Sequence, residues 1–207
     1  MLVVEAVGGV LTGSLALLSD AGHVLADVGA LVLALVALGV ASRPPTLRKS
    51  FGYHRFEVLA ALGNGLTLWV LVAFLAWEAV RRLSEPVDVD VAGMLGVAGL
   101  GLVANVASAV LLARVQEAGL NLRAALLHVI GDLLGSVGTL VAGAVMWATG
   151  WTRADPIASL FICALILVSS WTLIRDTVNV LMEGTPREVD MDALQRAIAA
   201  EPGIRGV

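Results

Sequence analysis

The chain carries, from Ser14 to Ala41, the run SLALLSDAGHVLADVGALVLALVALGVA. This run is longer than the about 20 apolar residues that a helix needs to cross a ~30 Å hydrocarbon layer. It is interrupted by Asp20, His23 and Asp27. An acidic side chain at bilayer depth costs roughly 2.5 to 3.5 kcal/mol, so ionisable residues within a membrane-spanning helix indicate a functional site.

The composition of the whole chain agrees with a lipid environment. Of its 207 residues, 58% are apolar and only 14% are charged, and the mean hydropathy is +0.91. Soluble domains average about 45 to 50% apolar and about 25% charged residues. The net charge of -4 offers no basic surface, so no nucleic-acid partner is expected. Cys163 is the single cysteine, which excludes an intramolecular disulfide bond and a cysteine-based zinc cluster.

The apolar runs predict an all-α integral membrane protein, a six-helix transmembrane bundle in the lipid bilayer. The expected helices cover about 1–12, 14–41, 57–80, 91–115, 122–147 and 156–180. The first run would cross only about half of the ~30 Å layer, so we expect a first helix truncated at its N-terminus. The transmembrane domain is expected over 1–181. Residues 182–207 are expected to begin an incomplete C-terminal domain, with an amphipathic helical pattern over 188–201.

The distribution of Lys and Arg predicts the orientation, because cytoplasmic loops carry the excess of these residues. One side carries eight of them: Arg43, Arg48, Lys49, Arg55, Arg114, Arg123, Arg175 and Arg187. The other side carries three: Arg81, Arg82 and Arg153. We therefore expect a multi-pass protein of the cell (inner) membrane with both termini in the cytoplasm.

The same short pattern occurs in two of the expected helices. His23-Val-Leu-Ala-Asp27 and His128-Val-Ile-Gly-Asp132 both read His-Val-aliphatic-small-Asp. Residues four apart lie on one helix face, about 5 to 6 Å from each other. Two such helices facing each other would supply two nitrogen and two oxygen ligands, which is a set suited to tetrahedral zinc.

Charge and ligand chemistry favour the same interpretation. Two ionised aspartates and two neutral imidazoles would leave a bound divalent cation formally neutral, as a low-dielectric position requires. Mg²⁺ and Ca²⁺ prefer oxygen ligands, whereas imidazoles favour zinc, cadmium, cobalt or nickel. Small residues at Gly22, Ala26, Gly131 and Gly135 would let the two helices approach closely. The alternative is that each His-Asp pair only makes hydrogen bonds between helices.

Other polar residues within the apolar runs are candidates for smaller roles. Asp20 is either an entry or exit ligand for a cation or a charge that favours the helix dipole. Asn64 and Asn105 are expected to form hydrogen bonds between helices rather than to bind metal. Asp155 precedes Pro156 and is expected to cap the N-terminus of its own helix. Interfacial ion pairs are expected for Glu57 and Glu78 with Arg55, Arg81 and Arg82.

Several sequence blocks of the chain resemble those of a known family of transporters. The blocks that carry the resemblance are Gly13-Ser-Leu-Ala-Leu-Leu-Ser-Asp-Ala-Gly-His-Val-Leu-Ala-Asp27, Phe51-Gly-Tyr-His-Arg-Phe-Glu57, Asn121-Leu-Arg-Ala-Ala-Leu-Leu-His128 and Leu181-Met-Glu-Gly-Thr-Pro186. They are similar to blocks of the cation diffusion facilitator family, the zinc transporters that export or sequester Zn²⁺ from the cytosol. The likeness covers essentially the whole chain.

The resemblance implies a proton-coupled antiporter, usually a homodimer, with a cytoplasmic C-terminal domain of metallochaperone-like α/β form. It implies that His23, Asp27, His128 and Asp132 are the transport-site ligands. In some relatives the residue that matches His54 helps to bind an interfacial metal; the alternative is a solvated loop histidine. The chain departs from the family pattern by its short first helix, by the lack of a His-rich run between the fourth and fifth helices, and by its short cytoplasmic part.

We therefore expect a transporter rather than an enzyme, with Zn²⁺ as substrate and no cofactor. A Zn²⁺/H⁺ antiporter would export zinc by alternating access, in which the helix pair that carries both motifs rocks against the other helices. Protons compete with metal for an imidazole, whose reference pKa is about 6.5. The alternatives are an exporter of mainly Cd²⁺, Co²⁺ or Mn²⁺, and a membrane metal sensor or scaffold that moves no metal. An intramembrane metalloprotease is disfavoured because the His-Glu-xx-His pattern is absent from the sequence.

Overall fold

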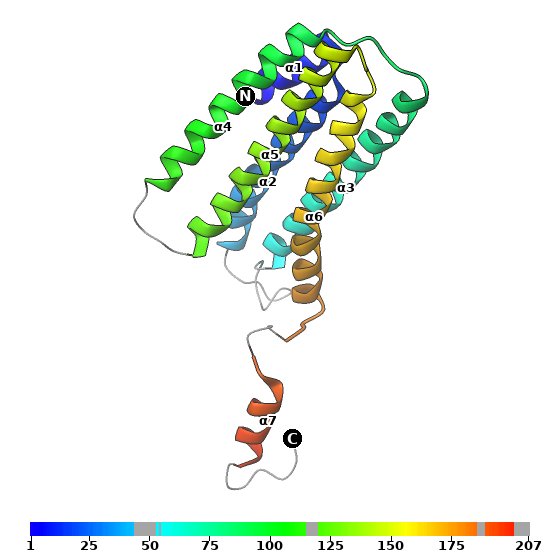
Figure 1. Ribbon diagram of the computed structural model, residues 1–207. Coiled ribbons are helices and arrows are strands. Elements are labelled where there is room, and N and C mark those ends of the chain that lie inside the picture. Colours follow the sequence, from blue (N-terminus) through cyan, green and yellow to red (C-terminus); the bar gives the residue numbers. More distant parts are fainter. Residues whose placement is uncertain (44–52, 54, 115–119, 186–188, 201–207) are drawn as a thin grey trace.

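The computed structural model describes residues 1–43, 53, 55–114, 120–185 and 189–200, and for 120–128 only the backbone. All regular elements in these ranges are helices (Figure 1). They are α1 (Leu2–Thr12), α2 (Leu15–Ala41), α3 (Arg55–Ser84), α4 (Val91–Ala113), α5 (Leu120–Thr149), α6 (Ala154–Leu181) and α7 (Met191–Ala199). Five of them, α2 to α6, are long and apolar enough to cross a membrane, and α1 is a shorter apolar helix. The predicted all-α membrane bundle is therefore confirmed.

The helix ends follow from local chemistry. Ser14 and Asp90 cap α2 and α4: the Ser14 hydroxyl accepts a hydrogen bond from the backbone N–H of Leu17, and the Asp90 carboxylate accepts one from Gly93. Asp190 caps α7 in the same way, so this amphipathic helix begins after Asp190 and not at the expected residue 188. The predicted patterns located these helices, and the caps set where they begin.

Helix α3 extends beyond the expected residue 80, to Ser84. In its last turns Arg81 and Arg82 both pair with Glu78, at 2.7 and 2.9 Å. These pairs keep the polar end of the helix ordered past its apolar part. The expected ion pairing of Glu78 is confirmed. At the other end of α3, Arg55 pairs with Glu183 rather than with Glu57.

Many large apolar side chains on the long helices are exposed. This exposure agrees with the expected contact with lipid. The buried core lies between α2, α3, α4, α5 and α6 and includes Leu17, Val72, Met94, Ile162 and Ile166. Along the α3–α6 contact, the rings of Trp69 and Trp171 stack with centroids 5.7 Å apart. This contact makes α3 and α6 one of the firmly packed helix pairs.

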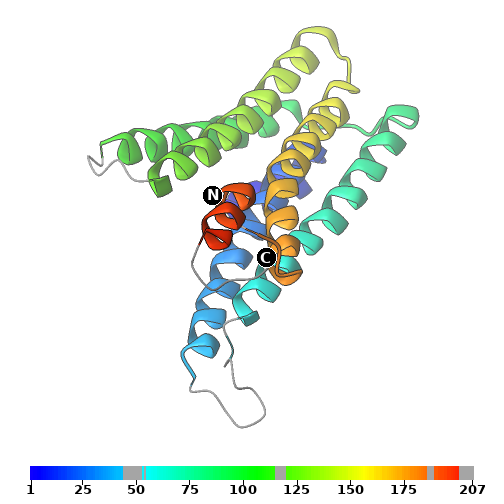
Figure 2. The same ribbon diagram turned by 90° about the horizontal axis from the view of Figure 1, so that it is seen from below.

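The bundle has a compact end and a spread end. We call the end with the α1–α2, α3–α4 and α5–α6 turns the upper end, as it lies in Figure 1, and the opposite end the lower end. Toward the lower end, α4 and α5 diverge from α2, α3 and α6, which is clearest from below in Figure 2. Helix α4 packs mainly along α5, whereas α2 packs mainly on α3 and α1.

This arrangement corrects the expectation that α2 and α5 form a close pair. Their mutual contact is small compared with the contacts that each makes elsewhere. A Cβ atom built on Gly22 would touch Leu71 of α3 and not α5, and one on Gly131 would meet nothing within 4 Å. Only Gly135 faces α2, where a Cβ atom would lie 3.4 Å from the carboxylate of Asp20. The small residues therefore pack α2 on α3, and they leave space rather than close contact beside Gly131.

The turn between α1 and α2 depends on Gly13, whose φ of 73° is in the left-handed region. In Gly13→Ala, the left-handed conformation costs roughly 1 to 2 kcal/mol, and the new Cβ atom would lie 3.0 Å from the carbonyl oxygen of Asp88. We expect a lower free energy of unfolding, measured by denaturant titration in detergent. The matched control is Gly39→Ala within α2, where a Cβ atom meets nothing within 4 Å and helix propensity predicts a gain of about 0.8 kcal/mol. Equal stability of the two variants would contradict the argument.

Candidate functional site

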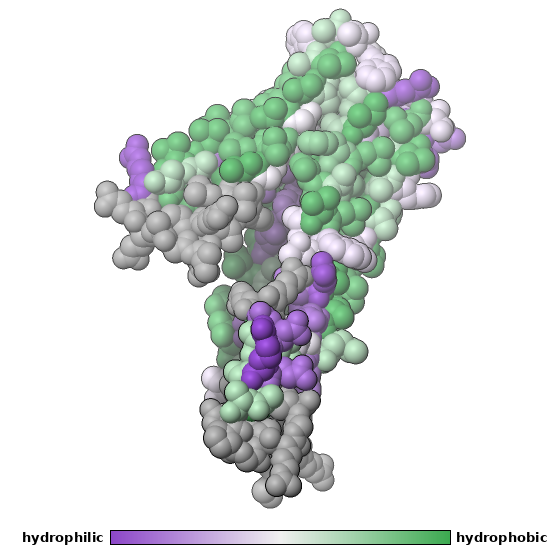
Figure 3. Space-filling view, turned by 60° about the horizontal axis from the view of Figure 1, so that its bottom comes forward, coloured by the Kyte–Doolittle hydropathy of each residue, from purple (hydrophilic) through white to green (hydrophobic). Residues whose placement is uncertain are grey.

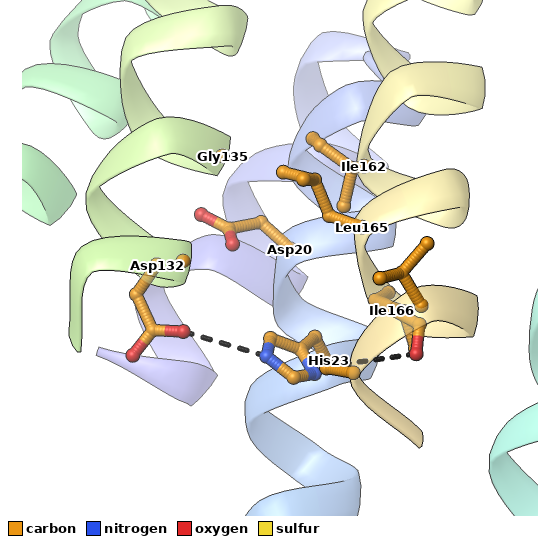
Figure 4. A pocket seen from close by; sticks show the side chains of 10 residues that line it. Asp20, His23, Asp132, Gly135, Ile162, Leu165 and Ile166 are labelled. Carbon is orange, nitrogen blue, oxygen red and sulfur yellow. Dashed lines mark hydrogen bonds and ion pairs between the residues drawn. The ribbon is translucent and has the colours of Figure 1, made fainter. Parts of the chain in front are cut away.

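The imidazole of His23 on α2 faces α5. Its Nε2 atom is 3.4 Å from Oδ1 of Asp132 on α5 and 3.7 Å from Oδ2 of Asp27, one turn further along α2. Figure 4 shows His23 and Asp132 pointing toward each other across the gap between their helices. The structure thus brings together three of the residues that the two repeated motifs predict, from two different helices.

These separations suit a shared cation. Two ligands of a tetrahedral zinc ion with bonds of about 2.0 to 2.1 Å are about 3.3 Å apart. The 3.4 Å between His23 and Asp132 is close to this value, and Asp27 would have to move by a few tenths of an ångström. Among the residues described with side chains, no three are already arranged around one ion position. Instead, Nε2 of His23 lies within 4 Å of an oxygen of each carboxylate, so binding of an ion between them requires the side chains to rearrange.

The side chains at this position are shielded but not sealed. His23, Asp132 and Asp27 are 15%, 19% and 33% exposed. They are therefore poorly solvated, and the charges of the two carboxylates have a stronger effect than they would in water. The two carboxylates of such a position can attract a divalent cation, because water screens their charges only partly.

Two predicted metal-site residues cannot be placed by their side chains. His128 lies on α5 one turn before Asp132, so the backbone puts both on one helix face, but its side chain is outside the described part of the structure. His54 is outside the described residues altogether. Their expected roles stay predictions.

A cavity of about 220 Å³ adjoins the site. Its lining comes from three helices: Asp20, His23, Gly131, Asp132 and Gly135 on α2 and α5, and Ile162, Leu165, Ile166, Val168 and Ser169 on α6. Seen from nearer the lower end, Figure 3 shows hydrophilic side chains inside a hollow between the two diverging helix groups. A hydrated cation could thus approach the imidazole through a space with apolar walls and a polar inner end.

Asp20 is almost fully buried beside this cavity. It interacts with Ser136 of α5, and the Ser136 hydroxyl accepts a hydrogen bond of 3.1 Å from the amide of Asn105 on α4. Asp20 therefore belongs to a polar cluster that joins α2, α5 and α4 above His23. This places Asn105 in a contact between helices.

Asn64 lies at a second cavity, of about 210 Å³, nearer the lower end. This cavity is enclosed by α2, α3 and α6, and Glu57 also lines it. The side-chain oxygen of Asn64 points toward Gly29 of α2, 3.9 Å from the position that a Cβ atom would take there. Asn64 and Glu57 are not brought next to His23.

Asp155 acts differently from the sequence-based expectation. The carboxylate is 1% exposed and caps α2 instead of its own helix. It accepts hydrogen bonds from the Ser14 hydroxyl at 2.6 Å and from the backbone N–H groups of Leu15 and Ala16 at 2.7 and 3.2 Å. Helix α6 already begins at Ala154, so Asp155 lies within its first turn and is available to a neighbouring helix. The Asp-Pro signal identified a capping residue but assigned it to the wrong helix.

The sequence pattern predicted no role for Glu5, a buried carboxyl group on α1. Glu5 is 2% exposed, and its Oε2 atom has no hydrogen-bond partner among the described residues. The available signal was that Glu5 is the one charged residue in the otherwise apolar stretch from Met1 to Val10.

Residues 1–182 match the family model described as the cation efflux transmembrane domain. The chain is 47% identical over 208 residues to the zinc transporter ZitB of Escherichia coli (strain K12), which covers 100% of this chain and 66% of that protein. It is 42% identical over 212 residues to the cadmium, cobalt and zinc/H⁺-K⁺ antiporter of Bacillus subtilis (strain 168), with 100% and 67% covered. The metal cation efflux system protein CzcD of Cupriavidus metallidurans is 42% identical over 204 residues, with 99% and 65% covered. The chain thus spans about two thirds of the length of these relatives.

Proposed function

The chain belongs to the cation diffusion facilitator family, and we propose that it exports Zn²⁺ from the cytoplasm in exchange for protons, with zinc as substrate rather than as a cofactor. The observation that carries the proposal is the approach of His23 on α2 to Asp132 on α5, with Asp27 at 3.7 Å from the same nitrogen. His128, one helical turn from Asp132, would complete a set of two imidazoles and two carboxylates.

The ligand set supports zinc as the main substrate. Two imidazole nitrogens select against Mg²⁺ and Ca²⁺, and the tetrahedral preference of zinc matches four protein ligands without water. Cd²⁺ and Co²⁺ accept the same ligands, in agreement with the name of one relative, the cadmium, cobalt and zinc/H⁺-K⁺ antiporter. Two aspartates would neutralise the cation where water is scarce.

Proton coupling follows from the same ligands. An imidazole must be neutral to bind metal, so a proton and a zinc ion exclude each other at His23. We infer that the lower end faces the cytoplasm, because Arg43, Arg114 and Arg175 lie toward that end. Zinc would then bind from the cytoplasm through the cavity beside α6 and leave toward the upper end, where incoming protons displace it.

The packing supports a specific moving part. Helix α5 packs on α4 and, less extensively, on α6, and it makes little contact with α2. Alternating access would move the α4–α5 pair against the remaining helices. The site lies on this boundary, with His23 on one side and Asp132 on the other. The family resemblance adds a homodimer in the cell membrane to the proposal.

The test is zinc uptake into proteoliposomes with an imposed pH gradient. Vesicles with an acidic interior should accumulate Zn²⁺ several-fold faster than vesicles without a gradient, and a protonophore should remove the difference. The matched control is Asp192→Asn, which removes an exposed carboxylate of α7 and should transport like the wild type. Uptake that ignores the gradient would defeat the proton coupling, and absence of any zinc flux would defeat the transport function.

A further inference from the structure

Glu5 is a carboxyl group that the proposed zinc site does not use. It lies on the face of α1 that packs against α4 and α2, and it is 2% exposed. A Cβ atom built on Gly101 of α4 would lie 2.8 Å from its Oε1 atom. Gly101 therefore leaves the space that the carboxyl group occupies.

The position of Glu5 is deep in the apolar layer. Gly101 lies ten residues after the start of α4 at Val91, which is about 15 Å of helix and roughly half of the ~30 Å hydrocarbon layer. The Oε2 atom of Glu5 has no hydrogen-bond partner among the described residues. An ionised carboxylate without a partner costs several kcal/mol at such a depth.

The charged groups around Glu5 oppose one another: the amino group of Met1 favours its ionised form, and carboxyl groups on two other helices disfavour it. Helix α4 has no Asp, Glu, Lys, Arg or His between Val91 and Ala113. The groups that act on Glu5 electrostatically are the amino group of Met1 and the carboxyl groups of Asp20 on α2 and Asp132 on α5. Two of these three groups repel a negative charge on Glu5, and both of them line the cavity at the zinc site.

We propose that Glu5 carries a proton while the site at His23 and Asp132 is empty of metal and releases it when a divalent cation binds there. The inference rests on the proposed transport function. The cation neutralises the negative charge of Asp132, so the repulsion on Glu5 disappears and its ionised form is stabilised across a low-dielectric region. When Zn²⁺ enters, the O–H bond of Glu5 breaks, its electron pair stays on the carboxylate, and the proton passes to water.

This arrangement gives the carrier a proton site that is separate from its metal ligands. Protons at the ligands themselves compete with the metal for the same atoms, whereas Glu5 would respond to the charge of the cation from a different helix. Glu5 would therefore act on the transported ion only through electrostatic interaction, and it would not touch the ion. The consequence is a larger number of protons exchanged per cation than the ligands alone supply.

The experiment counts protons. The purified protein in detergent is titrated with Zn²⁺ in weakly buffered solution at pH 7 with an indicator dye, and the dependence of log Kd on pH is measured in parallel. Glu5→Gln keeps the shape and the neutral state of the side chain. We expect it to release fewer protons per bound Zn²⁺, by up to one, and to flatten the slope of log Kd against pH by the same number. Glu5→Asp, which retains an acid, should restore most of the release.

The outcomes separate this inference from the proposed function. Wild-type protein that binds no Zn²⁺ would overturn the transport site. Zinc binding with an unchanged proton count in Glu5→Gln would overturn only the role of Glu5. If Glu5→Gln does not fold, infrared difference spectra of the wild type with ¹³C-labelled glutamate decide the question. A protonated carboxyl band must then disappear on addition of Zn²⁺, and a band that stays would overturn the inference.

Discussion

Asp132→Ala should abolish zinc transport and strongly weaken zinc binding. In the proposed site, Asp132 contributes a ligand and one of the two negative charges that neutralise the cation. Its removal leaves the cation with an uncompensated charge in a poorly solvated position. Removing one partner of a buried set of charges costs about 3 to 5 kcal/mol, which corresponds to a roughly 100- to 5,000-fold higher Kd.

The measurement is isothermal titration calorimetry with Zn²⁺ in detergent, together with uptake into proteoliposomes. Asp132→Asn tests the charge alone, because the amide keeps the size and one oxygen ligand of the side chain. Asp192→Ala is the matched control: it removes an exposed carboxylate of α7 and should leave Kd within about two-fold of the wild type, since a distant surface charge is screened within roughly 10 Å. A Kd for Asp132→Ala equal to that of the wild type would eliminate Asp132 as a ligand.

Asp155→Ala should destabilise the fold strongly while leaving zinc binding nearly unchanged. The variant removes the acceptor of three hydrogen bonds, from Ser14, Leu15 and Ala16, at a position that is 1% exposed. Each buried donor left without a partner costs about 1 to 3 kcal/mol, and such costs are not fully additive. The negative charge at the N-terminus of α2 is lost as well. We expect a decrease of about 3 to 5 kcal/mol in the free energy of unfolding.

Unfolding in detergent, followed by tryptophan fluorescence, measures this effect. Ser14→Ala removes the N-cap hydroxyl but keeps Asp155, and should cost about 0.5 to 2 kcal/mol. The wild type should therefore be the most stable, Ser14→Ala less stable, and Asp155→Ala the least stable. Asp155→Ala protein that unfolds like the wild type would mean that the carboxylate does not hold the upper ends of α2 and α6 together.

The local features of this protein could be predicted from the sequence because they depend on residues close together in the chain. Apolar runs of about 20 residues determine membrane-spanning helices whatever they pack against. A spacing of four residues places His23 and Asp27 on one helix face, and the pairing of Glu78 with Arg81 and Arg82 follows from spacings of three and four. The repeated motif likewise indicated that α2 and α5 act together at one site.

The partners of each helix could not be predicted in the same way, because in lipid almost any apolar face can lie against lipid or another helix. Only the tertiary structure shows that Asp155 caps a helix 140 residues earlier in the chain. It also shows that Gly22 packs on α3 rather than on α5, and that Gly101 makes room for Glu5. These contacts join residues far apart in the chain, and sequence spacing carries no information about them. The sequence by itself determined the helices and the motif residues, and the packing decided which helices face one another and which buried charges lie near the site.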